Sequence, residues 1–183
     1  MTRTMKREQA APARRDERRH PIVPPSSGGA AAGLRAGLVM GLLLCAKTAA
    51  DGSGFWLPMR AIAALWRGAP ALLGGAPTIA LGVGTHLVTA ALLGGIFASL
   101  LGRGARPRAA LGLGLAYGAV VWAVMTFAVV PAFDPVLARR LALMPVWWLS
   151  AHLAYGALLM RVPSYRRRGA RELEPGVEPK TFY

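Results

Sequence analysis

The sequence has 183 residues, of which 54% are hydrophobic, and its formal net charge is +14. High apolarity together with high charge excludes an ordinary soluble domain and also a chain that is disordered throughout. The two properties are separated along the chain, because the ends are rich in Arg and Pro and the middle is apolar. We therefore expect basic disordered tails at 1–32 and 163–183 on either side of a membrane domain at 33–162.

Four apolar stretches approach or exceed the roughly 18 to 20 residues that a helix needs to cross a hydrocarbon core. They cover about 33–50, 78–101, 109–130 and 142–161. A long polar segment precedes the first stretch, which lacks a convincing cleavage site, so we do not expect a cleaved signal peptide. The expected fold class is an all-α integral membrane protein with four transmembrane helices.

Lys and Arg are distributed unequally between the two sides of these spans. Most of them lie in the two tails and in the loop between the second and third spans, whereas the opposite side holds Arg60, Arg67, Arg139 and Arg140. Cytoplasmic segments carry an excess of basic residues, so both termini are expected in the cytoplasm. The predicted location is the bacterial inner membrane.

Small residues recur at every fourth position in the first three spans. Such ridges let helix backbones approach closely in lipid, where no hydrophobic force drives helices together. The expected helix-packing positions are Gly33, Gly37, Gly41, Gly82, Gly94, Gly114 and Gly118. In the second span His86 lies on the same ridge, so we expect its ring to face a neighbouring helix and not lipid.

The two halves of the apolar region resemble each other. HLVTAALLG (86–94) and HLAYGALLM (152–160) share His, Leu, Ala, Leu and Leu at matched offsets, and GLVMG (37–41) resembles GLAYG (114–118). A Pro-containing connection follows each member of the second pair. We expect two duplicated helical hairpins running in the same direction, an arrangement that occurs in transporters.

His86 and His152 are equivalent residues in this repeat, each about 12 Å from the outer end of its span at about 1.5 Å per residue. Ionisable groups inside a membrane are costly and favour a functional hypothesis, here a polar path for protons or a solute. One alternative is a neutral imidazole bonded to a hydroxyl or carbonyl group across a helix interface. Another is haem b held by two axial histidines, although no cofactor is the leading expectation. No metal site is expected, because the single cysteine, Cys45, lies in another helix.

Lys47 and Asp51 form a second polar pair, one helical turn apart at the outer end of the first span. They are suited to neutralise each other, or to let Lys47 extend toward water. The alternative is a role in binding an ion near a pore mouth. The stretch FWLPMRAIAALW (55–66) is too short to span, so we expect an interfacial or re-entrant helix there.

Taken in order, these elements resemble the YagU-like family of bacterial inner-membrane proteins and related small four-helix membrane proteins. The stretches that carry the resemblance are AGLVMGLLLCAKTAAD, LPMR, GVGTHLVTAALLGGIFASL and WLSAHLAYGALLM, within residues 33–162. The residues placed on that family's pattern are Lys47, Asp51, Pro58, Arg60, His86 and His152. The resemblance implies a membrane fold and brings no established biochemical activity.

We expect no enzyme, because the sequence has no phosphate-binding Gly loop, zinc-protease motif or recognisable Ser–His–Asp arrangement. The leading hypothesis is a transport, channel or membrane-homeostasis role in which His86 and His152 line a polar path. Four helices are few for a pore, so a homo-oligomer is expected. The alternatives are a structural or scaffold membrane protein and a bis-histidine haem electron carrier. The expected partners are the lipid bilayer and anionic lipids at the basic tails, without nucleic acid.

Overall fold

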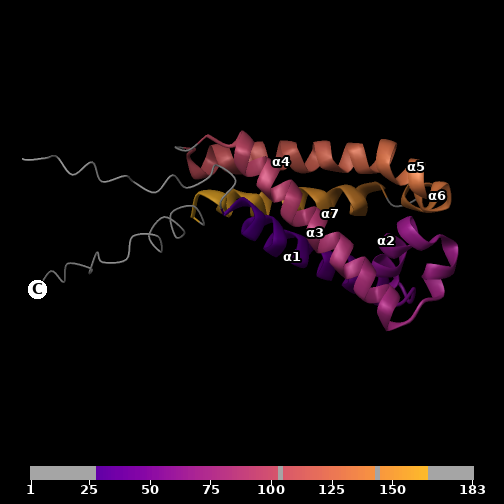
Figure 1. Ribbon diagram of the computed structural model, residues 1–183. Coiled ribbons are helices and arrows are strands. Elements are labelled where there is room, and N and C mark those ends of the chain that lie inside the picture. Colours follow the sequence, from indigo (N-terminus) through magenta and orange to yellow (C-terminus); the bar gives the residue numbers. More distant parts are fainter. Residues whose placement is uncertain (1–27, 103–104, 143–144, 165–183) are drawn as a thin grey trace, which may run out of the picture.

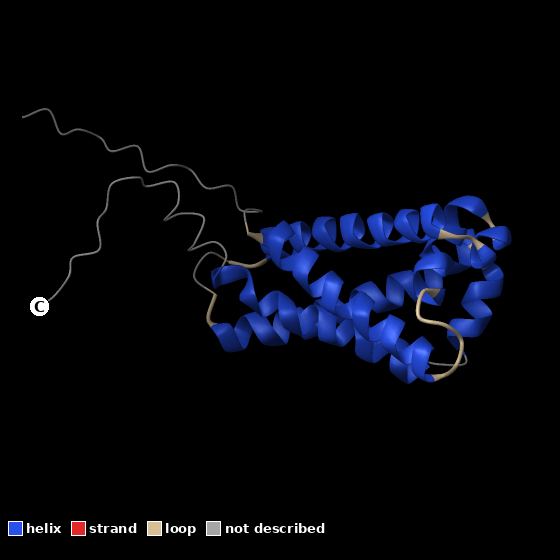
Figure 2. Cartoon of the chain, turned by 90° about the horizontal axis from the view of Figure 1, so that it is seen from below, coloured by secondary structure: helices blue, strands red, loops and turns tan. Residues whose placement is uncertain are grey.

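The structure is a computed structural model that describes residues 28–102, 105–142 and 145–164. Throughout these residues the regular secondary structure is helical, as the sequence predicts (Figure 2). The expected tails lie almost entirely outside the described residues. At the N-terminal boundary the first helix begins at Gly29, which is earlier than the expected start at residue 33.

The helices follow the expected order, with short helices between the long ones. The first half contains α1 (Gly29–Ala50), α2 (Leu57–Arg67), the 3-10 helix η1 (Ala69–Leu73) and α3 (Ala76–Leu100). The second half contains α4 (Pro107–Val124), the π-helical turn η2 (Met125–Val129), α5 (Val130–Phe133), α6 (Pro135–Ala142), α7 (Pro145–Leu158) and the 3-10 turn η3 (Leu159–Arg161). The start of α1 and the end of η3 lie at one end of the molecule, and α2, α5 and α6 lie at the opposite end (Figure 1).

Three helical segments are long and apolar enough to cross a membrane: α1, α3 and the continuous segment Pro107–Phe133 that joins α4, η2 and α5. The fourth expected span corresponds to α7 and η3. On its own α7 has 14 residues, fewer than a spanning helix needs. The described residues therefore form an all-helical fold with three helical segments that are long and apolar enough to span a membrane.

Helix α1 packs against α3 through glycines that bring the two backbones into contact. A Cβ atom at Gly33 would overlap the carbonyl oxygen of Ala90, and one at Gly37 would overlap the Ala90 side chain. On the facing helix, Gly94 lies directly against the backbone of Gly33. Only residues without a side chain allow this approach, which in lipid supplies packing energy that the hydrophobic effect cannot.

Helix α4 packs against α7 in the same manner. A Cβ atom at Gly114 would overlap the carbonyl oxygen of Gly156, and one at Gly118 would overlap that of His152. Gly156 in turn faces the carbonyl oxygen of Gly114. The small residues of the third span therefore lie at a helix interface.

Gly82 has a different neighbour from the other ridge glycines. It lies against the backbone of Met59, so α2 and not α1 covers the outer part of α3. Helix α2 begins with Pro58 in its first turn, a position where the missing N–H costs nothing. This short helix is the one that the sequence predicts within residues 55–66.

Two tyrosine hydroxyl groups connect the second half to α3. Tyr155 of α7 donates a hydrogen bond of 2.7 Å to the carbonyl oxygen of Ala90, and Tyr117 of α4 donates one of 2.9 Å to that of Leu93. The ring of Phe97, which is fully buried, packs against Tyr117 at a centroid distance of 5.3 Å. These contacts join the α1–α3 and α4–α7 pairs at the centre of the bundle.

The helix that starts with α4 widens into the π-helical turn η2 before Pro131. Proline has no N–H to bond to the carbonyl group of Phe127, and its ring would press on that group in a regular helix. A π-helical turn relieves this conflict, and such turns occur often at functional sites. Here Met125 and Val129, the two ends of the turn, line the cavity described next.

Candidate functional site

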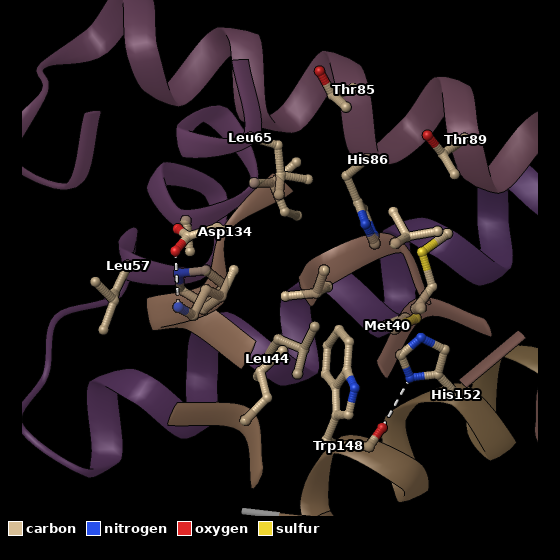
Figure 3. A pocket seen from close by; sticks show the side chains of 18 of the residues that line it. Met40, Leu44, Leu57, Leu65, Thr85, His86, Thr89, Asp134, Trp148 and His152 are labelled. Carbon is tan, nitrogen blue, oxygen red and sulfur yellow. Dashed lines mark hydrogen bonds between the residues drawn. The ribbon is translucent and has the colours of Figure 1, made fainter. Parts of the chain in front are cut away.

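A cavity of about 660 Å³ lies between the two helix pairs, in the half of the bundle nearest α2 and α6. Helices α1, α2, α3, α6 and α7 all contribute to its wall, together with the η2–α5 segment. The lining includes the exposed residues Asp51 and Ser53, so the cavity reaches the surface there. Figure 3 shows His86 and His152 approaching it from α3 and α7.

Most of the cavity wall is apolar. Its apolar residues include Met40, Leu44, Leu57, Ile62, Leu65, Leu93, Val121, Met125, Val130 and Leu137. The polar residues are few, and three of them, His86, Thr89 and His152, lie among the deeper apolar side chains (Figure 3). A largely apolar pocket with a few polar groups is the usual form of a small-molecule site.

The ring of His86 is held against α1. Its Nε2 lies 2.8 Å from the carbonyl oxygen of Gly37. A carbonyl oxygen can only accept, so Nε2 is the donor, and Nδ1 is the acceptor in the neutral ring. Gly41 provides the room for this ring, because a Cβ atom at Gly41 would lie 3.2 Å from Nε2.

The ring of His152 is held by its own helix. Its Nδ1 donates to the carbonyl oxygen of Trp148, one turn earlier, over 2.9 Å. The indole ring of Trp148 also packs edge-on against the imidazole, with a centroid distance of 4.4 Å and an interplanar angle of 78°. The neutral ring therefore presents Nε2 as an acceptor, and Figure 3 shows this nitrogen on the side away from the Trp148 carbonyl group.

The cavity brings the two predicted histidines together, but their hydrogen bonds are not equivalent. His86 bonds to another helix through Nε2, whereas His152 bonds within its own helix through Nδ1. For His86 the partner is a backbone carbonyl group across a helix interface, one of the alternatives that the sequence left open. For His152 the partner is a carbonyl group of its own helix, which the sequence did not predict. Each ring retains an unused acceptor nitrogen.

Lys47 and Asp51 lie at the mouth of this cavity and form an ion pair with each other. The side chains are 30% and 32% exposed. The Lys47 ammonium group also lies 5.9 Å from the ring centroid of Trp147. The structure thus places the pair where the sequence predicts it, with the two charges neutralising each other.

Trp148 and Tyr155 line the cavity although the sequence analysis did not assign them to the site. Trp148 Nε1 donates to the hydroxyl oxygen of Thr126, which belongs to the π-helical turn η2, over 2.9 Å. Tyr155 follows His152 by three residues, and residues three apart lie on one face of a helix. That spacing was the signal in the sequence that could have identified Tyr155.

The side chains of the site bear on two ligand types, a metal ion and a haem. Among the described residues, no three His, Cys, Asp or Glu side chains are grouped so that they could hold a metal ion. A bis-histidine haem requires one nitrogen of each ring to face a common iron atom. Because His86 Nε2 faces Gly37 on α1 and His152 Nδ1 faces its own helix, the observed ring orientations do not provide the usual pair of Nε2 ligands.

Comparison with known families shows where the chain belongs. Residues 24–172 match a family of unknown function, DUF6789. The chain is a member of the DUF6789 family. The DUF6789 match covers every described helix and all the cavity residues, and the family brings no activity with it. Searches of curated proteins and of solved structures found no match. The resemblance to YagU-like proteins stays a prediction.

Proposed function

We propose that this protein is a four-span protein of the bacterial inner membrane that binds a small, mainly apolar solute in the His86/His152 cavity. In this proposal the solute carries a hydrogen-bond donor, and binding serves a transport or membrane-homeostasis role. The observation that carries the proposal is the pair of histidine rings, each with an acceptor nitrogen, in a largely apolar cavity that reaches the surface.

The proposed fourth span is α7 continued by η3. Together they cover residues 145–161, which would extend about 25 Å at about 1.5 Å per residue. The start of α1 and the end of η3 lie at the same end of the molecule (Figure 1), as an even number of spans requires. The excess of Lys and Arg in the tails favours the cytoplasm for this end.

The proposed duplication of the two hairpins is supported by matched contacts. Gly41 lies against the ring of His86 in the first half, and Gly118 lies against the carbonyl oxygen of His152 in the second. These residues occupy corresponding positions in the two sequence repeats. Parallel repeats of this kind place binding sites between the repeated units, which is where the cavity lies.

The packing of the described residues fits a binding cavity that is closed at one end better than it fits an open pore. Tyr155 lines the deep part of the cavity and is itself bonded to Ala90. Toward the opposite end the core is closed by Phe97, Leu159 and Val162, which are each 0% exposed. Transport through this protein would therefore require a second conformation in which that end opens.

The two histidines define the chemistry of the proposed solute. Both rings already donate to carbonyl groups, so each offers an acceptor and no further donor in its neutral form. A ligand with a hydroxyl or protonated amine group satisfies these acceptors, whereas one with only acceptor groups does not. The apolar wall accommodates the remainder of such a molecule.

The test uses 4-bromophenol and 4-bromoanisole, which differ in whether the oxygen carries a hydrogen. Bromine quenches tryptophan fluorescence, and Trp147 and Trp148 line the cavity. We expect 4-bromophenol to bind the full chain in nanodiscs about fivefold more tightly than 4-bromoanisole, since a net hydrogen bond contributes about 1 kcal/mol. Empty nanodiscs containing a soluble indole derivative correct for partitioning.

The double variant His86→Leu/His152→Leu removes both acceptors and should abolish the preference for the phenol. The double variant His86→Gln/His152→Gln, which keeps an acceptor oxygen at each position, should restore part of it. Equal binding of the two probes by the unaltered protein would refute the proposed site. A Soret absorption band in protein expressed with haem would instead favour the electron-carrier alternative.

A further inference from the structure

A second, smaller depression lies at the opposite end of the bundle from the histidine cavity. It occupies about 180 Å³ between α1 and the α7–η3 segment. Its lining consists of Ala32, Arg35, Ala36, Val39, Leu158 and Arg161. We name this depression the Arg35/Arg161 groove.

Two guanidinium groups from distant parts of the sequence meet at the groove. Arg35 belongs to α1 and Arg161 to η3, and both side chains are exposed. Guanidinium groups bind phosphate oxygens in a bidentate manner, and two of them suit a phosphodiester better than a single charge does.

The remainder of the groove is apolar. Ala32 and Ala36 are 2% and 1% exposed and form its floor, where their small side chains leave a depression. Val39 and Leu158 form walls on the side toward the bundle centre. A ligand that fits both parts has an anionic head beside the arginines and a hydrocarbon chain along the floor.

We infer that the Arg35/Arg161 groove binds an anionic phospholipid, with its phosphate between the two arginines and an acyl chain over Ala32 and Ala36. Basic pockets between membrane helices on the cytoplasmic side are suited to such headgroups. On the proposed topology the groove lies at the cytoplasmic end, where the basic tails already favour anionic lipid. A soluble phosphate ion would use the arginines alone and leave the apolar floor uncovered.

Native mass spectrometry of the full chain in detergent tests the inference by titration with phosphatidylglycerol or phosphatidylcholine. A basic residue near an anionic lipid headgroup contributes roughly a fivefold change in affinity. We therefore expect R35Q/R161Q to weaken phosphatidylglycerol binding about 25-fold. The matched control R106Q/R108Q removes two charges at the same end, from outside the groove, and should change binding little.

Equal weakening in the two double variants would overturn the inference, because general charge would then explain the binding. Displacement of the lipid by millimolar inorganic phosphate would overturn it in favour of a simple anion site. Quenching by 4-bromophenol reports the distant histidine cavity, so normal quenching in R35Q/R161Q shows that the variant is folded. If the unaltered protein shows no quenching but lipid binding depends on the groove, the proposed solute site fails and the lipid site stands.

Discussion

Replacing Gly114 by alanine tests whether α4 and α7 are held together by direct backbone contact. The new Cβ atom would overlap the carbonyl oxygen of Gly156, and a carbon atom normally stays about 3.3 Å or more from such an oxygen. No flexible side chain can move aside, because the neighbour is backbone and Gly156 also faces the Gly114 carbonyl group. The helices must separate, so we expect Gly114→Ala to lower the free energy of unfolding by about 1 to 3 kcal/mol.

Gly112 on the same helix provides the matched control. A Cβ atom added at Gly112 meets no other atom within 4 Å. Alanine is also the better helix former by up to about 1 kcal/mol, so Gly112→Ala should be as stable as the unaltered protein or more stable. Steric trapping in bicelles measures the free energy of unfolding for both variants. Equal stability of Gly114→Ala and Gly112→Ala would refute the close packing of α4 on α7.

Three further predictions concern the contacts around the cavity. Tyr155→Phe removes the hydrogen bond to the carbonyl oxygen of Ala90. In the same trapping assay it should lower the free energy of unfolding by about 0.6 kcal/mol, and by at most about 1.7 kcal/mol. No loss would mean that the bond contributes nothing to stability. Gly41→Ala places a Cβ atom 3.2 Å from Nε2 of His86 and should shift the ring away from the Gly37 carbonyl group. We expect a loss of about 1 kcal/mol in the trapping assay, and no loss would mean that this hydrogen bond survives or contributes nothing. Lys47→Ala breaks the partly exposed ion pair with Asp51 and should change stability by less than about 1 kcal/mol, so a larger loss in the trapping assay would contradict a merely superficial pair.

The helical class and the small-residue interfaces follow directly from the sequence, because apolar length and four-residue spacing are local signals. The partner of each ridge was less predictable. Gly82 continues the ridge of Gly94, yet it contacts Met59 of α2 and not α1. Periodicity shows which face of a helix is packed, and it does not show which of several short elements reaches that face.

The candidate site was also predictable from the sequence only in part. Apolar surroundings and matched spacing place His86 and His152 inside the bundle, and the structure brings both to one cavity. Their different hydrogen-bond partners depend on ring orientation and on the crossing of α1 with α3, which no pattern in the sequence encodes. The role of Trp148 was also missed, since an aromatic residue at the start of a span ordinarily marks the membrane interface.

The difference between the two histidines can be traced to the position one turn before each of them. On the proposed duplication, Trp148 occupies the position that Gly82 occupies in the first half. Gly82 has no side chain, so the backbone of α2 approaches α3 there, and His86 turns to the Gly37 carbonyl group on α1. In the second half the indole ring of Trp148 packs against His152, whose Nδ1 bonds to the Trp148 carbonyl group.

The difference between glycine and tryptophan at this position gives a physical reason for an asymmetric cavity between two similar hairpins. If both halves carried glycine at this position, the short helix of each half could approach its long helix equally closely. With tryptophan in one half, the indole ring takes up the space beside the α7 backbone and lines the cavity. The proposed duplication would account for the shared glycine contacts, and divergence at a single position would account for two histidine rings that bond through different nitrogens beside one largely apolar cavity.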